Sequence, residues 1–279
     1  QVYLDMYKDK ELQEPYGDDW PDCYILKALR YPGSQYSKEE AIRARKAFYA
    51  QCTQIDYEIR LLIGTLRECN LLDDTIIVFL SDHGDMLFDH NMVAKRLMYD
   101  NSARIPLIIT GKPALEYRGK GYEDKLATMS DVMPTLLDMC GISIPDHVDG
   151  FPLFSSNKRE YIYGEVSNGE KATRMIRNER YKLIYYPTGN VKQLFDMVND
   201  PHETHDLSGT DEYKPILESM EKTLITELYG SDLDWIKDGR LVGVEAPPEF
   251  QPNPDFGLYN QRGYHWPQPK GSSNKRKNA

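Results

Sequence analysis

A polar loop directly after an apolar run holds the residues best suited to chemistry. The run Thr75–Ser81 is followed by Asp82, His83 and Gly84. A carboxylate supplies the hard oxygen that divalent cations prefer, and an adjacent imidazole supplies a nitrogen ligand or a supporting hydrogen bond. Asp82 and His83 are therefore candidate metal ligands. The alternative interpretation is an ordinary polar turn, because Asp-His-Gly often follows a strand without binding anything.

The apolar run predicts the strand that positions this loop. Residues 75–81 read Thr-Ile-Ile-Val-Phe-Leu-Ser, a continuous β-branched and aromatic run typical of a parallel strand buried on both faces. In open α/β sheets, ligands bind in the crevice beyond the carboxyl ends of the strands, where Asp82 and His83 fall. Residues 105–110 predict a second buried strand, and residues 125–130 predict a shorter third one.

A long helix precedes the first strand. Ser37-Lys-Glu-Glu40 has the form of a capping box, in which the hydroxyl and the carboxylate each accept a hydrogen bond from the other residue's amide. Apolar residues then recur every three or four positions as far as Cys69, which predicts a helix with one continuous apolar stripe. A shorter helix is predicted over 132–140. Residues 1–36 show neither period and predict a surface connection.

The chain divides into three parts. Residues 1–155 form the α/β part. Residues 156–243 hold four strand-like runs, at 160–166, 172–177, 181–186 and 191–196, which predict a small antiparallel sheet covered by a helix over 217–229. Residues 244–279 are rich in proline, and the last ten are expected to be disordered.

The overall charge excludes some classes of protein. The chain has 34 Lys and Arg against 44 Asp and Glu, a formal net charge of −10, which argues against a dedicated nucleic-acid binder. An anionic substrate would need a local cationic site. The apolar runs are only strand-sized, so no membrane-spanning helix is expected. The four cysteines form no C-x-x-C pair, which argues against a zinc knuckle.

The loop and the segments after it resemble the sulfatase family, part of the alkaline-phosphatase superfamily. Two segments, 81–96 and 99–109, are similar to the family's second metal-ligand segment. Others follow in the family's order: Met129–Leu137, Val148–Gly150, Arg177–Ile184 and Leu194–Glu203. The resemblance spans residues 36–210 and is closest to iduronate-sulfatase-like and bacterial arylsulfatase members. It implies an α/β fold, the C-terminal part of an alkaline-phosphatase-like mixed sheet with flanking helices, joined to the small antiparallel α+β subdomain.

The resemblance also implies roles for four residues. Asp82 would ligate Ca²⁺, or less often another divalent metal, and His83 would occupy the adjoining ligand position. Lys95, thirteen residues after Asp82, would hold a sulfate oxygen. His90 matches a histidine with a role in the pocket or at the leaving group. Hydrogen bonding within the loop is an equal alternative for His90.

Two features depart from the family's pattern. Phe88 and Asn91 stand where many members have glycine. The family's nucleophile is a formylglycine made from a Cys or Ser in an x-Pro-x-Arg motif, and none of the four cysteines has that context: Cys23, Cys52, Cys69 and Cys140. The family's N-terminal pair of metal-binding aspartates is also missing. We therefore expect a C-terminal portion that lacks the formylglycine segment, is inactive by itself and associates with the missing N-terminal segment.

The expected activity is hydrolysis of a sulfate ester in a sulfated saccharide or an aryl sulfate. One alternative is a phosphonate or phosphate ester hydrolase of the same superfamily. Another is a non-catalytic module that binds an anion or a partner. Arg104 and Arg174 are expected to form structural salt bridges. The family's tendency favours a periplasmic or secreted protein, but the sequence does not fix the compartment.

Overall fold

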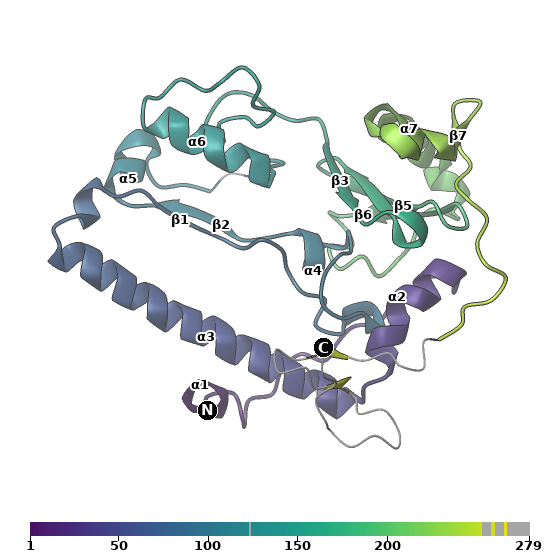
Figure 1. Cartoon of the computed structure of the whole chain (residues 1–279), viewed down its shortest axis with the longest axis horizontal. Helices are drawn as coiled ribbons and strands as arrows, with labels where there is room; N and C mark the ends of the chain where they lie inside the picture. The colour runs from purple at the N-terminus through teal and green to yellow at the C-terminus, as the bar shows by residue number, and fades with distance from the viewer. Residues whose placement is uncertain (123, 253–257, 260–264, 267–279) are drawn as a thin grey trace, which may run out of the picture.

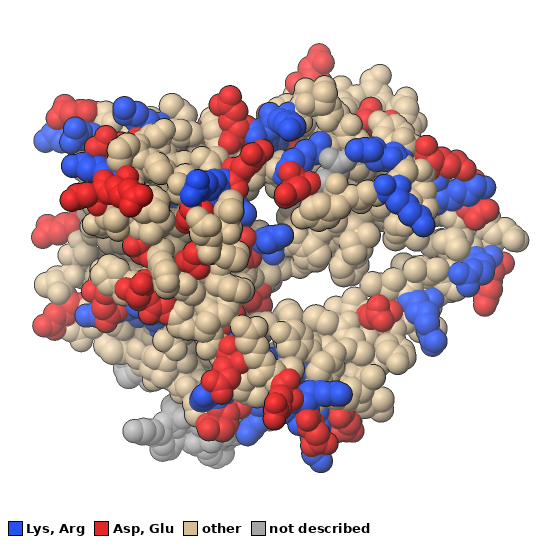
Figure 2. Space-filling view, turned by 180° about the vertical axis from the view of Figure 1, so that it is seen from behind, with Lys and Arg blue, Asp and Glu red and all other residues tan. Residues whose placement is uncertain are grey.

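The computed structural model describes residues 1–122, 124–252, 258–259 and 265–266 (Figure 1). A long helix and a two-stranded ribbon occupy one part of the molecule, and a four-stranded sheet with its covering helix occupies another. Acidic and basic side chains are interspersed over the face seen in Figure 2. The disorder expected for the last ten residues lies outside the described residues. Among the described helices, none has the length and apolar character needed to cross a membrane.

The long helix α3 (Lys38–Glu68) confirms the predicted capping box. The Ser37 hydroxyl accepts a hydrogen bond from the Glu40 amide at 3.3 Å, and the Ser37 amide donates to the Glu40 carboxylate at 2.9 Å. Much of its apolar stripe is nevertheless open to solvent. The buried residues lie in the first half of the helix, and further along it Leu62 is 60% exposed.

The first 36 residues are more regular than predicted. They contain the short helix α1 (Val2–Asp5) and the eleven-residue helix α2 (Tyr24–Ser34), so the prediction of an irregular connection was wrong there. Pro32 and Gly33 lie in the last turn of α2, which hid the helix in the sequence. Ile25 and Leu26 are almost fully buried and anchor α2 in the core. That burial stabilises the helix more than local propensity does.

The two apolar runs form strands β1 (Ile77–Leu80) and β2 (Leu107–Thr110), which pair antiparallel with Leu80 opposite Leu107. The expectation of a parallel strand buried on both faces was therefore wrong. Only these two strands make up the sheet within the described residues, so their faces are half covered and Ile108 is 54% exposed. A continuous apolar run reports side chains suited to burial, whereas burial itself depends on neighbouring elements.

Short helices flank the ribbon. They are η1 (Leu72–Asp74), α5 (Lys112–Arg118), η3 (Met129–Asp131) and α6 (Val132–Met139). The helix predicted over 132–140 is confirmed, but the strand predicted over 125–130 is wrong. The Thr128 amide donates to the Asp131 carboxylate at 2.8 Å, and this capping box turns the chain into η3 and α6 instead of extending it.

The small antiparallel sheet forms as predicted. Its strands β3 (Ile162–Val166), β4 (Thr173–Arg177), β5 (Tyr181–Tyr186) and β6 (Val191–Asp196) pair in chain order. Helix α7 (Lys214–Glu227) covers one face, where Met220 and Leu224 pack with residues of the sheet. The other face packs on α2 and on the loop after β1, in a second cluster that includes Trp20 and Tyr99.

The remaining described elements are short. They are η2 (Asp89–Asn91), α4 (Asp100–Ala103), η4 (Gly169–Lys171), η5 (Asp211–Tyr213), η6 (Gly230–Trp235), β7 (Ile236–Lys237), β8 (Arg240–Leu241), β9 (Leu258–Tyr259) and β10 (His265–Trp266).

Candidate metal and anion site

Asp82 and His83 lie together at the end of β1. Nε2 of His83 is 3.2 Å from Oδ2 of Asp82, and the Asp82 side chain is 79% exposed. Nδ1 of His83 lies 2.7 Å from the carbonyl oxygen of Gly84, and the two form a hydrogen bond in the tautomer that carries its proton on Nδ1. In the neutral ring Nε2 then has a lone pair, which faces the carboxylate. Two acceptors at this separation require a proton or a cation between them.

Gly84 fixes the backbone beneath this pair. Its amide donates to the carbonyl oxygen of Ser102 in α4 at 2.8 Å. A Cβ atom at Gly84 would lie only 2.0 Å from the carbonyl oxygen of Asn101, so this approach admits only glycine. Helix α4 therefore forms the support against which the Asp82–His83 pair is held.

The loop that follows is unusually strained. Six non-glycine residues between positions 87 and 96 have positive φ, including Phe88 at 73°, Asn91 at 57° and Ala94 at 63°. Such conformations cost roughly 1–2 kcal/mol each outside glycine, and strain of this kind clusters at functional sites. The left-handed backbone at Phe88 and Asn91 gives a physical reason for the glycines expected at those positions.

Lys95 lies on the returning limb of this loop. The Met86 amide donates to the Ala94 carbonyl at 2.8 Å, and this contact places the backbone of Lys95 beside that of Asp85. The Lys95 side chain is exposed, and no described residue forms a hydrogen bond or ion pair with its ammonium group. The ammonium is therefore available to an anion.

His90 is buried, unlike the other three candidates. Its Nδ1 is 3.1 Å from the carboxylate of Asp18, its Nε2 is 3.0 Å from the carbonyl oxygen of His202, and its ring stacks on Trp20. Both nitrogens are occupied, so this geometry favours the alternative in which His90 stabilises the loop. Neighbouring Asp89 is also buried and pairs with Arg45. Burial raises the pKa of Asp89, and the Arg45 charge opposes that shift.

Two arginines illustrate the structural role that the sequence predicts. Arg174 is buried and bonds Asp232 through Nε at 2.6 Å and Nη2 at 3.0 Å, which confirms its structural salt bridge. Arg104 is exposed, and its guanidinium lies 4.0 Å from the carboxylate of Asp100. Asp100 has stronger partners that the sequence did not predict, Lys182 and Arg177. Their only sequence signal is a pair of cations in neighbouring strand-like runs.

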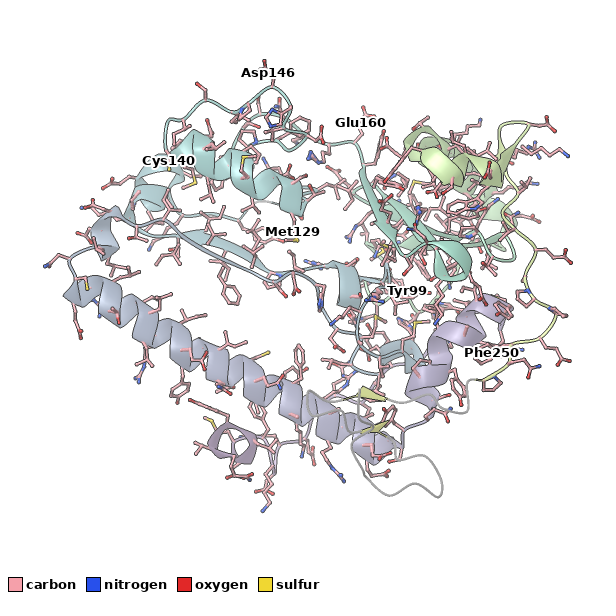
Figure 3. All side chains as sticks on the ribbon, in the orientation of Figure 1. Tyr99, Met129, Cys140, Asp146, Glu160 and Phe250 are labelled. Atoms are coloured by element: carbon pink, nitrogen blue, oxygen red, sulfur yellow. The ribbon has the colours of Figure 1, made fainter. Side chains whose placement is uncertain are left out.

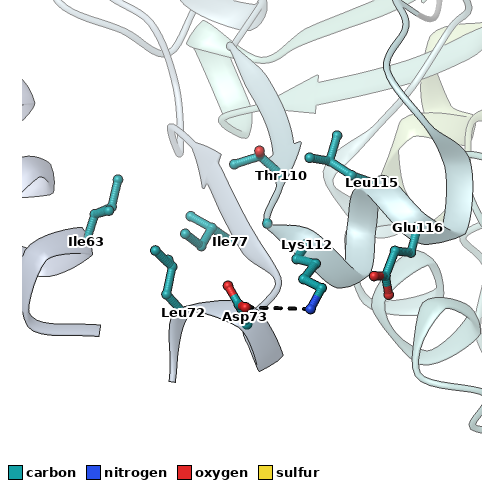
Figure 4. Close-up of a pocket in the computed structure, with 9 residues that line it drawn as sticks. Ile63, Leu72, Asp73, Ile77, Thr110, Lys112, Leu115 and Glu116 are labelled. Carbon is teal, nitrogen blue, oxygen red and sulfur yellow. Dashed lines mark ion pairs between the residues drawn. The ribbon is translucent and has the colours of Figure 1, made fainter. Parts of the chain in front are cut away.

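A hollow lined by other described residues lies elsewhere. It has a volume of about 460 Å³ and lies between α3, η1, the two strands and α5 (Figure 4). Ile77 and Thr110 line it from the ribbon, and Lys112 pairs with Asp73 across it at 3.5 Å. Ile77 is the first residue of β1, so this hollow is at the opposite end of the strand from Asp82.

Comparison with known families identifies the class of protein. The family model described as N-sulphoglucosamine sulphohydrolase, C-terminal, matches residues 88–229, and the model described as Sulfatase matches residues 7–142. An arylsulfatase of Clostridium perfringens is 35% identical over 258 residues, which is 86% of this chain and 52% of that protein. The chain belongs to the sulfatase family. It spans about half the length of this relative.

Solved structures confirm the expected fold. A phosphonate monoester hydrolase from Silicibacter pomeroyi is similar with a TM-score of 0.68 at 23% identity, over 84% of this chain and 54% of that one. A protein solved with its substrate, D-glucosamine-2-N,6-O-disulfate, is similar with a TM-score of 0.58 at 25% identity, over 68% of this chain and 41% of that one. The chain therefore has the α/β fold of sulfatase and alkaline-phosphatase-like structures.

Sulfatases generally use a divalent metal ion and a formylglycine, and the donor atoms of this chain fit the metal ion in part. Asp82 and His83 present an oxygen and a nitrogen acceptor side by side, which suits a divalent cation. Within the described ranges, however, no group of three or more His, Cys, Asp or Glu side chains is arranged to hold a metal. The chain does not fit formylglycine, because all four cysteines are free thiols outside the required motif.

Proposed function

We propose that this chain is the metal- and sulfate-binding portion of a sulfuric ester hydrolase that acts on a sulfated saccharide or an aryl sulfate. Asp82 and His83 hold a divalent cation, with Ca²⁺ the first candidate, and Lys95 binds a sulfate oxygen. The observation that carries the proposal is the position of Nε2 of His83, held 3.2 Å from Oδ2 of Asp82 at the end of β1. His90 stabilises the loop and has no catalytic part in this proposal.

The chemistry of the site follows from charge. A cation held by Asp82 and His83 would neutralise the anionic oxygens of the ester and would stabilise the charge that develops as the S–O bond breaks. Lys95 adds a positive charge on the same loop. No described residue pairs with its ammonium group, so an anion would not have to displace one. The nucleophile and the remaining metal ligands come from a sulfatase N-terminal segment outside this sequence. Two ligands alone, against the six to eight oxygens that Ca²⁺ takes, bind a hard cation more weakly than the roughly 1 mM of the weakest complete protein sites.

Metal binding by the 279-residue chain tests the site. Terbium luminescence reports Ca²⁺-type binding, and Asp82→Asn should weaken it at least about tenfold. Asp146→Asn is the matched control, because Asp146 is an exposed carboxylate on a distant loop (Figure 3). If the unmodified chain shows no saturable terbium binding, or if the two variants behave alike, the proposed metal site is wrong.

Activity tests the reaction. The chain joined to a sulfatase N-terminal segment should hydrolyse an aryl sulfate, and Lys95→Ala should lower the turnover about 10²–10³-fold, the usual loss for a charge-stabilising group. An aryl phosphonate serves as the competing substrate. Faster turnover of the phosphonate would replace the sulfatase by the phosphonate or phosphate ester hydrolase, and no turnover of either would favour a non-catalytic module.

A further inference from the structure

A largely buried cluster of four charged side chains joins the small sheet to α4, the helix that contacts the Gly84 backbone. Lys182 and Arg177 lie directly opposite each other on β5 and β4. Two like charges in register across neighbouring strands repel each other. The carboxylate of Asp100, at the start of α4, accepts hydrogen bonds from both residues. Nη1 of Arg177 lies 2.7 and 3.0 Å from its two oxygens, and Nζ of Lys182 donates to one of them. The sheet therefore presents two neighbouring positive charges that the Asp100 carboxylate of α4 neutralises in part.

Glu203 completes the cluster and balances its charge. Lys182 also donates to Glu203 at 2.7 Å and to the carbonyl oxygen of Met98 at 3.1 Å, and Glu203 accepts the amide of Asp100 at 2.7 Å. The side chains of Lys182 and Glu203 are only 1% and 2% exposed. Two positive and two negative groups thus lie together, and of these Lys182, Glu203 and Asp100 are buried while Arg177 is partly exposed. Loss of one member would leave a buried charge without its partner.

We propose that Lys182 and Arg177 are positioning residues, which hold α4 through Asp100 and thereby fix the Gly84 backbone that orients the Asp82–His83 pair. Two hydrogen bonds connect α4 to His83. The Ser102 carbonyl of α4 accepts a hydrogen bond from the Gly84 amide, and the Gly84 carbonyl oxygen is hydrogen-bonded to Nδ1 of His83. A carbonyl that orients a metal-ligating histidine tunes that ligand.

A second contact fixes the same end of α4. Tyr99, which directly precedes the helix, donates its hydroxyl to Gln193 of β6 at 2.6 Å and lies 2.9 Å from the hydroxyl of Tyr186. Figure 3 shows Tyr99 where α4 meets the four-stranded sheet. The small sheet therefore holds the beginning of α4 in place. The inference rests on the proposed function only in so far as Asp82 and His83 are taken to bind a metal.

The test replaces Lys182 with methionine, which keeps the length of the side chain and removes its charge. Lys192→Met is the matched control, because Lys192 pairs with Glu221 at 2.8 Å on the same sheet, away from α4. In Lys182→Met, hydrogen exchange at the Gly84 amide should be at least about tenfold faster than in the unmodified chain, as expected for loss of a charged hydrogen bond. Exchange in the β5–β6 ladder should change less. Terbium affinity should fall about tenfold in the folded protein. Lys192→Met should change neither.

A double variant separates positioning from stability. Lys182→Met with Glu203→Gln restores charge balance, so its unfolding midpoint should recover, while Gly84 exchange stays fast and terbium binding stays weak. Unchanged Gly84 exchange in the folded single variant, or recovery of Gly84 protection together with the midpoint, would overturn the inference. If the unmodified chain binds no terbium, the proposed function fails, and the exchange data alone decide the positioning role.

Discussion

Replacing Gly84 with alanine is expected to damage both the fold and the metal pair. The new Cβ would lie 2.0 Å from the carbonyl oxygen of Asn101, and ordinary contact begins at 3.4 Å, so one backbone segment must retreat by about 1.4 Å. That movement breaks the hydrogen bond from the Gly84 amide to Ser102. Overpacking costs about 1–3 kcal/mol and a lost hydrogen bond about 1 kcal/mol, so unfolding should become easier by about 2–4 kcal/mol. The midpoint of the transition that unfolds the Gly84 loop should fall on the order of 5–10 °C.

The same retreat moves the carbonyl that holds His83. We expect the terbium affinity of Gly84→Ala to fall about 10–100-fold at a temperature where the protein is folded. Gly64→Ala is the control, because Gly64 lies inside α3 with open space around its Cβ, and alanine there should stabilise the helix by about 1 kcal/mol. A Gly84→Ala protein with unchanged midpoint and unchanged terbium affinity would refute the reasoning.

Three further predictions concern strain, buried charge and pH. Ala94→Gly should raise the free energy of unfolding by about 1 kcal/mol in urea titrations, because φ at this position is 63°; a decrease would contradict the strain. Arg174→Met should lower it by about 3–5 kcal/mol, because Asp232 stays buried without its partner, and adding Asp232→Asn should recover part of the loss. Burial alone would raise the pKa of Asp100, but Lys182 and Arg177 hold it below its ordinary value of 3.8. The stability that the charged form contributes is present above pH 3.8 and is lost as the pH falls through the lowered pKa. The destabilisation by Asp100→Asn should therefore be larger at pH 7 than at pH 2, and equal values would contradict this assignment.

Local patterns explain why some elements could be predicted from the sequence. The beginning of α3 is encoded by two residues three positions apart, Ser37 and Glu40, and the structure has both of their hydrogen bonds. The four strands of the small sheet are separated by turns and pair with their neighbours in the chain, so their order follows from their sequence. The position of Asp82 beside His83 was equally local, because the two are adjacent.

Features that depend on distant residues could not be predicted. The surroundings of β1 depend on β2, some thirty residues away, so its direction and burial were misjudged. The burial of His90 depends on Asp18 and on the carbonyl of His202, far away in both directions along the chain. The contact of Lys182 with Asp100 joins residues 82 positions apart. Each feature arises from tertiary packing, and no short window of sequence contains both partners.

The uneven burial of α3 and the ribbon has a calorimetric consequence. One hydrophobic cluster is built from Trp20, α2, the loop around Met86–Tyr99 and one face of the small sheet, and the other from the opposite face with α7, η6 and β8. Neither draws a buried member from α3, β1 or β2. Segments with few buried apolar contacts open with lower free energies than the core. Heating the isolated chain should thus melt the α3–ribbon layer first and the small-sheet layer afterwards, as two separate endotherms. The heat-capacity step of the second endotherm should correspond to the small-sheet layer alone, and not to all 279 residues.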